Sequence, residues 1–579
     1  MSHNENYDAR PWNKNYPAGN SPDLPAMPYT NIPDMITRVS QKYSNRKAFT
    51  VCLPNGMAAS LTFAEIDTLS DAFALYLTHE LNLSKGERVA VQMPNCLAYP
   101  IAMFGVLKAG LILVNVNPLY TTTEMEHQFN DSGAKALIII DLFGDKLGPV
   151  IPRTHIRNVI LVSLADFFPL PLKAIIKLKL KLTKQIPLCT IQSIPFTTAI
   201  SIGKSRLNSG AKPGVSPGSG SQNTMGLNDT AVLQYTGGTT GVSKGADLSH
   251  SNILSNMLQI NEVLKPRLDK NPEVILTALP LYHIFAFTVN CLTIYSLGGH
   301  NVLVPSPRPM SNLKKAFEKY EFTLITGVNT LFNALLQEPW FMQNPPTKLK
   351  AAVAGGTALQ SAVAERWMKA INVPIYEGFG LTESSPVLSI QPIGGKIKPD
   401  SVGIPTASTY LRCVDDNGVT VAVGERGELI AKGPQVMRGY WNRPEETAKT
   451  IKDGWLYTGD IATMDENGYF SIVDRKKDMI LVSGFNVYPN EVEDAIMKHA
   501  KVSEVCVIGV PDASSGEAVR AFVIAKDASL TSEELREHCK KTLTNYKVPK
   551  SVEFRKELPK TPVGKILRKD LRAEVLAQK

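Results

Sequence analysis

Apolar and polar residues recur along the chain with two different spacings, and each spacing predicts one type of element. Over 31–43 the apolar residues return every three or four positions, which predicts a helix, and we expect further helices over 98–109 and 311–320. Short apolar runs such as 136–140 and 351–354 predict strands. Because strand-like and helix-like segments alternate through most of the chain, we expect doubly wound α/β sheets.

Local signals mark where particular helices begin. Thr62 is followed three residues later by Glu65, a capping box in which each side chain accepts the other residue's backbone N–H. We expect one helix to start after Thr62 and another near Ser249. Residues 1–30 are rich in Asn, Pro and Tyr, and we expect them to form an extended leader.

Changes of composition divide the chain into domains. Residues 204–226 are mostly Ser, Gly, Pro and Asn, which predicts a flexible linker. From about 402 to 473, short strands and turns predict a small β-rich subdomain. We therefore expect a large N-terminal domain over 1–473, made of two doubly wound α/β subdomains and this β-rich subdomain. A hinge at 474–477 and a small, mobile α+β C-terminal domain at 478–579 complete the expected organisation.

Length, charge and cysteine content narrow the class of protein. At 579 residues the chain exceeds one compact core. A net charge of +9 suits nucleotides or acidic lipid head groups, but no basic block is long enough for a nucleic-acid-binding arm. The seven cysteines show no metal-ligand spacing, and no secretory signal is visible, so we expect a reduced, intracellular protein.

One segment is long and apolar enough to be considered as a membrane span. Residues 276–297 contain no Asp, Glu, Lys or Arg. Pro280, His283 and Asn290 interrupt the segment, and no positive flank orients it, so we expect a buried strand and helix instead.

A second segment could lie on a membrane surface. Residues 169–184 place Lys173, Lys177, Lys181 and Lys184 on one helical face, with Leu and Ile between them. This pattern is typical of a basic amphipathic helix on an anionic lipid surface. A solvated surface helix and an edge strand are the alternatives.

A stretch rich in Gly and Thr is the clearest candidate for phosphate binding. Its glycines let backbone N–H groups approach an anion, its threonines add hydroxyl donors, and Lys244 adds a positive charge. Lys244 lies between Ser243 and Gly245, so the stretch differs from the P-loop of nucleotide hydrolases, and an ordinary turn is the alternative. The candidate phosphate ligands are Thr236, Gly237, Gly238, Thr239, Thr240, Gly241 and Lys244.

Two motifs further along could complete a nucleotide site. In 376–383, Phe379 could stack on a base, Thr382 could donate to a phosphate, and Glu383 could bind a divalent cation. A buried turn with a capping Glu is the alternative. Asp460 follows a turn and could accept both hydroxyls of a ribose, although turn-capping aspartates are common.

Near the domain junction and the C-terminus, charged residues offer two further candidates. Residues 474–478 read Asp-Arg-Lys-Lys-Asp, and 559–566 place Lys565 on a loop with Gly and Pro. Taken singly, these are most simply a solvated linker and a surface lysine.

Together the motifs resemble the adenylate-forming superfamily of acyl-CoA synthetases, luciferases and adenylation domains, and the whole chain resembles its bacterial long-chain fatty acid–CoA ligases. The motifs occur in the expected order. Similarity extends between them, over 116–120, 280–286, 326–330 and 481–491.

This resemblance implies a reaction in two halves. A fatty acid carboxylate attacks the α-phosphate of ATP, which releases pyrophosphate and forms acyl-AMP. The thiol of coenzyme A then displaces AMP. The implied ligands are fatty acid, ATP, Mg²⁺ and coenzyme A. We expect a cytoplasmic monomer or homodimer in peripheral contact with the inner membrane, although the resemblance does not imply membrane contact through 169–184.

The resemblance also implies roles for individual residues. Lys565 bridges the carboxylate and the α-phosphate, where an ammonium stabilises the developing charge. Thr236 and Glu383 bind Mg²⁺, while Lys244 and its Gly/Thr neighbours hold the β- and γ-phosphates. The other implied positions are the ribose ligands Asp460 and Arg475, the hinge Lys477, the AMP-site residues Gly356, Phe379, Gly380 and Thr382, the pantetheine-side Ser483 and Gly484, and the acyl-pocket residues His283 and Gly327.

Asp247 departs from the pattern, because similar enzymes usually have an apolar residue there. A carboxylate near ATP phosphates repels them unless it is paired or points away. The alternatives to a long-chain ligase are a ligase for medium-chain or aromatic acids, an enzyme that stops at acyl-AMP, and a non-catalytic acid-binding homologue.

Overall fold

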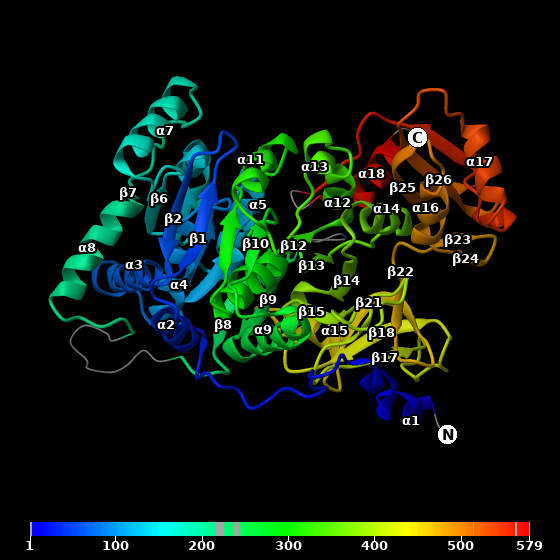
Figure 1. Cartoon of the computed structure of the whole chain (residues 1–579), viewed down its shortest axis with the longest axis horizontal. Helices are drawn as coiled ribbons and strands as arrows, with labels where there is room; N and C mark the ends of the chain where they lie inside the picture. Colours follow the sequence, from blue (N-terminus) through cyan, green and yellow to red (C-terminus); the bar gives the residue numbers. More distant parts are fainter. Residues whose placement is uncertain (1–2, 215–224, 237–242, 513, 562–563, 578–579) are drawn as a thin grey trace.

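The computed structural model describes residues 3–214, 225–236, 243–512, 514–561 and 564–577. Its described strands form four sheets: two large, mostly parallel sheets, a smaller antiparallel sheet, and a separate sheet in the C-terminal domain (Figure 1). The two large sheets, with helices packed against them, confirm the doubly wound α/β prediction.

The first large sheet contains both strands that flank the Gly/Thr stretch. Its order is β19-β9-β8-β4-β3-β5-β6-β7, and all pairs from β8 to β7 are parallel. The strands are β3 (Arg88–Gln92), β4 (Ile112–Asn115), β5 (Ala136–Ile140), β6 (Asn158–Val162), β7 (Ile194–Pro195), β8 (Thr230–Tyr235), β9 (Gly245–Ser249) and β19 (Gly439–Tyr440). Among its helices are α3 (Phe63–Leu75), α4 (Ala98–Lys108), α5 (Thr122–Ser132), α8 (Phe196–Asn208) and α9 (His250–Leu264).

The second large sheet has the order β16-β15-β14-β13-β12-β10-β11-β1-β2, parallel from β14 to β1. Its strands are β1 (Lys47–Cys52), β2 (Ala58–Thr62), β10 (Val274–Thr277), β11 (His300–Leu303), β12 (Leu324–Gly327), β13 (Ala351–Ala354), β14 (Ile375–Gly380), β15 (Val387–Ile390) and β16 (Ile404–Pro405). Its helices include α2 (Ile32–Lys42), α11 (Ser311–Lys319), α12 (Asn329–Leu335), α13 (Pro339–Gln343) and α14 (Ser361–Ile371).

The region after 402 is β-rich, as the turn pattern predicts. Its sheet contains β17 (Tyr410–Val414), β18 (Gly427–Lys432), β20 (Ile451–Lys452), β21 (Trp455–Met464) and β22 (Phe470–Arg475). Helix α15 (Pro444–Thr450) lies between β19 and β20 in the chain.

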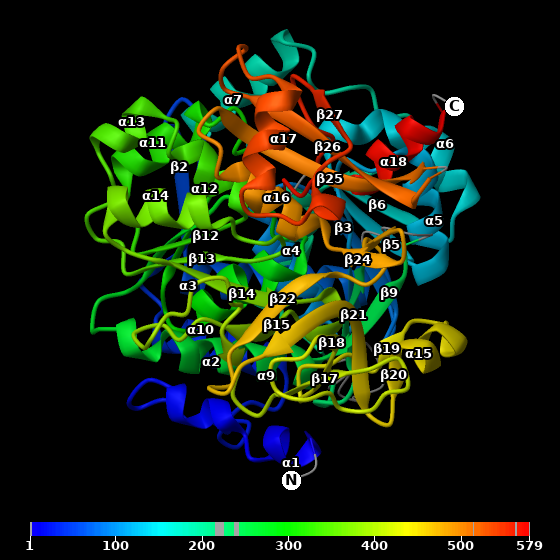
Figure 2. The same ribbon diagram turned by 90° about the vertical axis from the view of Figure 1, so that its right-hand side faces the viewer.

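The C-terminal domain has its own sheet and its own buried clusters, which contain only residues from Ile480 onward. Its elements are β23 (Ile480–Val482), β24 (Phe485–Val487), α16 (Pro489–Met497), β25 (Val502–Asp512), β26 (Gly516–Ala525), α17 (Ser532–Lys540), β27 (Ser551–Phe554) and α18 (Arg568–Ala577). Figure 2 shows this domain beside the large domain, with β22 leading toward it.

Both predicted helix starts are confirmed. Thr62 caps α3, and Thr62 and Glu65 form the reciprocal capping box. Ser249 caps α9, although its partner three residues later is Asn252. The linker expected from 204 begins later, because α8 continues to Asn208; residues 215–224 lie outside the described part of the chain.

The leader is not simply extended. It contains helix α1 (His3–Asp8) and a 3₁₀ turn, η1 (Pro11–Asn15), and it buries Tyr7 and Trp12. The apolar bodies of these two aromatic residues contribute to the main core, which outweighs the extended preference of the surrounding Pro and Asn residues.

The leader also makes hydrogen bonds to distant parts of the large domain. Asn15 Nδ2 donates to the carbonyl of Asn467, and Tyr16 Oη donates to the carbonyl of Pro405. Asn20 Nδ2 donates to the carbonyl of Glu262 on α9. The leader therefore connects the β-rich subdomain with both large sheets.

The apolar segment at 276–297 is buried within the large domain. It contains the end of β10, the π-helix η6 (Ala286–Thr293) and the short helix α10 (Ile294–Ser296). Thr277 Oγ1 and the carbonyl of Leu276 accept hydrogen bonds from Asn290, which satisfies this buried amide. In the described part of the chain, no helix is both long enough and apolar enough to cross a bilayer.

Candidate active site

The Gly/Thr stretch is the connection of a hairpin. Strands β8 and β9 pair in antiparallel fashion, and Thr236 N donates to the carbonyl of Lys244 over 3.0 Å, which closes the loop at its base. Gly237, Gly238, Thr239, Thr240 and Gly241 lie outside the described residues. Helix α9 starts directly after β9, so both ends of the loop are fixed by regular structure.

Lys244 and Glu383 are brought together by Tyr440, a residue of β19. Tyr440 Oη donates to Glu383 Oε1 over 2.6 Å, and Lys244 Nζ lies 4.8 Å from the centre of the Tyr440 ring. Glu383 is in the 3₁₀ turn η7 (Thr382–Ser384), just after β14. Residues from two separate motifs therefore meet at one tyrosine.

A second pair of charges lies across β21 and β22. Arg475 Nε is 2.7 Å from Asp460 Oδ1, and the two residues are direct neighbours in the antiparallel ladder. The Asp460 side chain is only 3% exposed, and burial raises its pKa to about 6. Its other oxygen, Oδ2, is buried without a hydrogen-bond partner among the described residues, so it is available to a hydroxyl donor.

Lys565 reaches this cluster from the C-terminal domain. Burial, and after it the nearby Arg475 guanidinium, lower its pKa to about 8, although the Asp460 carboxylate acts in the opposite direction. The loop is held by Thr330 of α12, whose Oγ1 donates to the carbonyl of Gly564 over 3.2 Å. The C-terminal domain is therefore docked with its lysine beside the two ribose candidates.

Three candidates for the AMP site, and the acyl-pocket candidate Gly327, lie where neighbouring parallel strands end. Gly327 ends β12, Gly356 follows β13, and Phe379 and Gly380 are the last residues of β14. Strands β12, β13 and β14 are adjacent, so these ends share one edge of the sheet, the usual position of ligands in open α/β sheets. Gly356 has φ +80°, which favours glycine at this turn.

His283 lies near the docked lysine. Burial lowers the pKa of His283 to about 4, and the positive charge of Lys565 acts in the same direction, so the imidazole is neutral at pH 7. Its Nδ1 accepts from Phe285 N at 3.3 Å. A neutral ring suits the wall of an apolar pocket.

Three of the predicted positions lie in the expected hinge segment and the C-terminal domain. Burial, followed by the Arg475 charge, lowers the pKa of Lys477. Ser483 and Gly484 form the exposed two-residue turn between β23 and β24, with φ of 50° and 84°. Figure 1 shows this turn at the outer side of the C-terminal domain, away from β14 and β21.

The structure shows how Asp247 is accommodated. Asp247 Oδ2 accepts from Arg438 Nη2 over 2.7 Å, and the carbonyl of Asp247 accepts from Arg438 N. Its side chain is 14% exposed. The carboxylate is therefore paired, which removes the repulsion expected of a free charge near phosphates.

Sequence reasoning missed Tyr440, Glu446 and Thr330, which contact the predicted residues directly. Tyr440 and Glu446 lie in segments of the β-rich region with no recognisable chemical pattern. Thr330, in the first turn of α12, lies in the similar segment 326–330, but the resemblance implies no role for it. These residues reach the site only through contacts between segments that are distant in the sequence.

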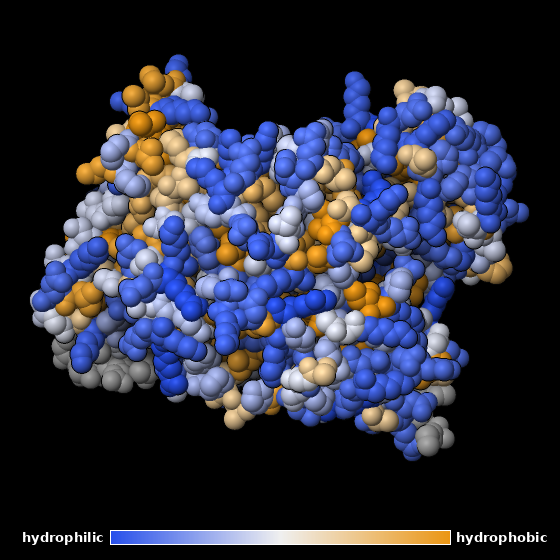
Figure 3. Space-filling model, viewed as in Figure 1, coloured by the Kyte–Doolittle hydropathy of each residue, from blue (hydrophilic) through white to orange (hydrophobic). Residues whose placement is uncertain are grey.

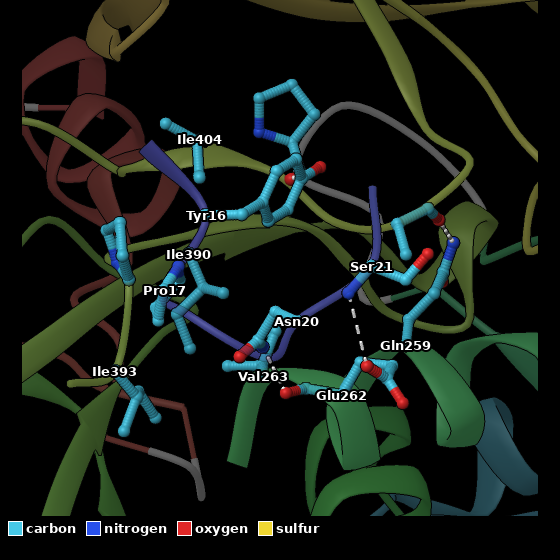
Figure 4. Close-up of a pocket in the computed structure, with 13 residues that line it drawn as sticks. Tyr16, Pro17, Asn20, Ser21, Gln259, Glu262, Val263, Ile390, Ile393 and Ile404 are labelled. Carbon is cyan, nitrogen blue, oxygen red and sulfur yellow. Dashed lines mark hydrogen bonds between the residues drawn. The ribbon is translucent and has the colours of Figure 1, made fainter. Parts of the chain in front are cut away.

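A small pocket elsewhere does not belong to this cluster. It has a volume of about 20 Å³ and lies between the leader and α9, where Tyr16, Asn20 and Glu262 border it (Figure 4). A volume of this size holds roughly one water molecule, since a water needs about 10–15 Å³. We assign no ligand to it.

Comparison with known proteins identifies the family of enzymes to which the chain belongs. Residues 36–441 match the AMP-binding enzyme family, and residues 491–565 match the AMP-binding enzyme C-terminal domain. The chain belongs to the family of AMP-binding enzymes.

Curated relatives extend over nearly the whole chain. A long-chain-fatty-acid–CoA ligase of Escherichia coli O157:H7 is 48% identical over 568 residues, 97% of this chain and 98% of the relative. A long-chain-fatty-acid–CoA ligase of Haemophilus influenzae is 46% identical over 572 residues, 98% of this chain and 99% of the relative. The crystal structure of an anthranilate CoA ligase in complex with anthranoyl-AMP aligns with a TM-score of 0.81 at 25% identity, over 95% of this chain and 98% of that one.

Proposed function

We propose that this chain is an ATP-dependent long-chain fatty acid–CoA ligase, which converts a fatty acid, ATP and coenzyme A into acyl-CoA, AMP and pyrophosphate. The identity of 46–49% with long-chain-fatty-acid–CoA ligases over almost the full chain supports the substrate class. The observation that carries the chemistry is the docking of Lys565 beside Asp460 and His283.

In the first half-reaction, a carboxylate oxygen of the fatty acid attacks the α-phosphorus of ATP. A P–O bond forms, and the bond to the bridging oxygen of pyrophosphate breaks. The Lys565 ammonium would neutralise both the carboxylate and the α-phosphate, and charge stabilisation of this kind is most effective in a site that excludes water. Its pKa of about 8 leaves most of the lysine protonated at pH 7.

The nucleoside would be held from two directions. Asp460 Oδ2 is the buried acceptor for a ribose hydroxyl, and Arg475 fixes the carboxylate through Oδ1. Phe379 offers a ring for the adenine, with Gly356 letting the backbone approach closely. Thr382, at the start of η7, would donate to the α-phosphate.

The triphosphate end would lie at the β8–β9 hairpin. Lys244, Thr236 and the Gly/Thr residues between them would bind the β- and γ-phosphates. The donor set fits Mg²⁺, because this ion is usually held by one or two carboxylates together with substrate phosphates. Glu383 and the Thr236 hydroxyl would supply the protein ligands, and no cluster of three or more His, Cys, Asp or Glu residues in the described chain offers a rival metal cage. When bound, the ion would neutralise phosphate charge.

In the second half-reaction, the thiol of coenzyme A attacks the acyl carbonyl and AMP leaves. We infer that the large domain at 1–473 and the C-terminal domain at 478–579 rotate about 474–477, with Lys477 at the hinge. The rotation would withdraw Lys565 and bring the turn of Ser483 and Gly484 toward the pantetheine. The separation of this turn from the Lys565 loop supports two alternating uses of one domain.

Separate assays of the two half-reactions test this assignment. We expect Lys565→Ala to abolish ATP–pyrophosphate exchange driven by long-chain acids, while thioester formation from preformed acyl-AMP largely survives. The neighbouring surface variant Lys569→Ala is the control and should change neither. Equal loss of both half-reactions in Lys565→Ala would contradict the hinge assignment.

A series of acids of increasing length tests the substrate class. A feruloyl-CoA synthase of Amycolatopsis is 32% identical over 515 residues, so aromatic acids belong in the series. Saturating turnover with long-chain acids, and weak turnover with medium-chain and aromatic acids, is expected. Product analysis also decides whether acyl-CoA forms or the reaction stops at acyl-AMP.

We further propose that helix α7 (Leu170–Leu182) contacts anionic membrane lipids. Its Ile176 and Leu180 are buried, which confirms a helix and rules out the edge strand. Ile175, Leu178 and Leu182 are 54–73% exposed, and their spacing of three and four places them on one side of the helix. Figure 3 shows the apolar patch at the projecting end of the molecule that α7 occupies in Figure 1.

The charge of the helix selects the kind of membrane. Lys177, Lys179 and Lys181 are exposed beside the apolar side chains, and each lysine near an anionic surface contributes about 1 kcal/mol. We expect co-sedimentation with phosphatidylglycerol vesicles, weaker binding to phosphatidylcholine, and loss of binding in Leu178→Ser/Leu182→Ser. Val419→Ser, an equally exposed site in the β-rich subdomain, is the matched control. Unchanged binding in the double variant would contradict the proposal.

A further inference from the structure

Lys244, the positive charge at the end of the Gly/Thr stretch, has a carboxylate partner. Its Nζ lies 2.6 Å from Glu446 Oε2, while the ring of Tyr440 packs against the same ammonium at 4.8 Å. Glu446 comes from α15, 202 residues further along the chain. The Lys244 ammonium, which we expect to bind phosphate, is therefore already paired with the Glu446 carboxylate.

The position of Glu446 is fixed by its own helix. It lies in the first turn of α15, which begins at Pro444, and carboxylates are favoured at a helix N-terminus. Its other oxygen, Oε1, accepts from Lys449 Nζ over 3.0 Å, one turn further on. The hydrogen bond from Lys244, with that from Lys449, lowers the pKa of Glu446 to about 2, so the group is an anion at all physiological pH values.

The contact resembles that of a phosphate oxygen. A carboxylate oxygen at 2.6 Å from an ammonium makes a short, charge-assisted hydrogen bond, as a phosphate oxygen would. Lys244 cannot keep this bond and also turn its charge fully toward a triphosphate. Lys449 offers Glu446 a second cation, so the carboxylate keeps a partner if Lys244 leaves.

We propose that Glu446 is an internal counter-ion that holds Lys244 in the absence of ATP and is displaced by the triphosphate. The inference rests on the proposed role of Lys244 in phosphate binding. Binding of ATP exchanges the Glu446 carboxylate for a phosphate on Lys244, and release of pyrophosphate reverses the exchange. Glu446 thereby weakens the affinity for ATP and favours the departure of pyrophosphate.

Calorimetric titration with ATP and Mg²⁺, without fatty acid, tests this exchange directly because no turnover occurs. We expect Glu446→Gln to bind ATP about two- to five-fold more tightly than the unmodified chain at low ionic strength, the range by which exposed ion pairs shift an equilibrium. The difference should shrink at high ionic strength. Inhibition by added pyrophosphate should become stronger in the same variant.

Glu445→Gln is the matched control, since it removes the same charge from the adjacent position of α15. It should leave ATP binding close to that of the unmodified chain. Equal tightening in both variants would show a general field effect, and unchanged or weaker binding in Glu446→Gln would show that Glu446 supports Lys244 instead. Either result overturns the proposal.

A double-mutant cycle separates this inference from the proposed function. Lys244→Ala should weaken ATP binding, and adding Glu446→Gln to it should then have no further effect on ATP affinity. If Lys244→Ala alone binds ATP as tightly as the unmodified chain, the assigned role of Lys244 fails. If Lys244→Ala weakens binding but Glu446→Gln changes nothing in either background, only the counter-ion proposal fails.

Discussion

Arg475 Nε lies 2.7 Å from Asp460 Oδ1 across the ladder of β21 and β22. The arginine uses one oxygen of the carboxylate and leaves Oδ2 as a buried acceptor without a partner in the described structure. An unpaired buried acceptor is costly, and a ligand hydroxyl would satisfy it. This geometry supports the proposal that the pair binds a nucleoside through Oδ2.

Asp460→Asn removes the charged acceptor, and we expect the KM for ATP to rise about 10-fold or more, since hydrogen bonds to charged groups contribute about 1.5–3 kcal/mol. The raised pKa of Asp460, about 6, adds a pH effect. As the pH falls through 6 the carboxylate gains a proton, so the affinity for ATP should fall there. A pH profile of KM for ATP checks this, with the exposed turn variant Asp453→Asn as the control. A wild-type-like acid limb in Asp460→Asn would contradict the assignment.

Lys565 should set the alkaline limit of the first half-reaction. Burial has lowered its pKa to about 8, so the ammonium is lost as the pH rises through 8, and pyrophosphate exchange should decline there. Lys565→Arg keeps the charge at higher pH, so its reduced exchange activity should lack this decline. Rates of exchange measured across the alkaline range decide the matter. The same decline in the arginine variant would assign the limit to another group.

Tyr440→Phe keeps the ring beside Lys244 but removes the hydroxyl that bonds Glu383 over 2.6 Å. Because residues that orient metal ligands typically change metal affinity by about 10–100-fold, we expect the Mg²⁺ concentration for half-maximal activity to rise about 10-fold. The KM for the fatty acid should stay nearly constant. A Mg²⁺ titration at saturating ATP provides the measurement, and an unchanged midpoint would remove Tyr440 from the metal site.

Thr330 holds the docked C-terminal domain through the carbonyl of Gly564. Thr330→Val removes the donor while keeping the side-chain shape, and we expect about a 3- to 10-fold slower first half-reaction, as for the loss of one hydrogen bond of about 1 kcal/mol. Thioester formation from preformed acyl-AMP should not slow, because the domain has left Thr330 by then. Thr347→Val, at an exposed position of the large domain that contains Thr330, is the control. Slowing of both half-reactions would point to misfolding of α12 instead.

Much of the fold follows from the sequence pattern because long, periodic segments dominate their own structure. The helix predicted at 31–43 is observed as Ile32–Lys42, and the strand predicted at 136–140 has those bounds. The leader shows the limit of this reasoning: Tyr7 and Trp12 become buried only through contact with distant segments. The composition of residues 1–30 does not indicate these long-range contacts.

The site is predictable to the same extent. Motifs point to Asp460, Glu383 and Lys565 as candidates because their residue types and order are distinctive. Their neighbours Tyr440 and Glu446 lie in unremarkable segments and reach the site through the pairing of β19 with β9 and the start of α15. Sequence reasoning finds groups that do chemistry more readily than groups that position them.

The leader has a mechanical consequence. Its bonds from Asn15 to Asn467, from Tyr16 to Pro405 and from Asn20 to Glu262 act as a brace between the β-rich subdomain and the rest of the large domain. Gly468 also packs closely on Trp12: a Cβ added to Gly468 would lie 2.5 Å from the backbone nitrogen of Trp12. In the proposed domain rotation, this brace would keep the β-rich subdomain with the two large sheets, and the C-terminal domain would turn about 474–477 at the end of β22.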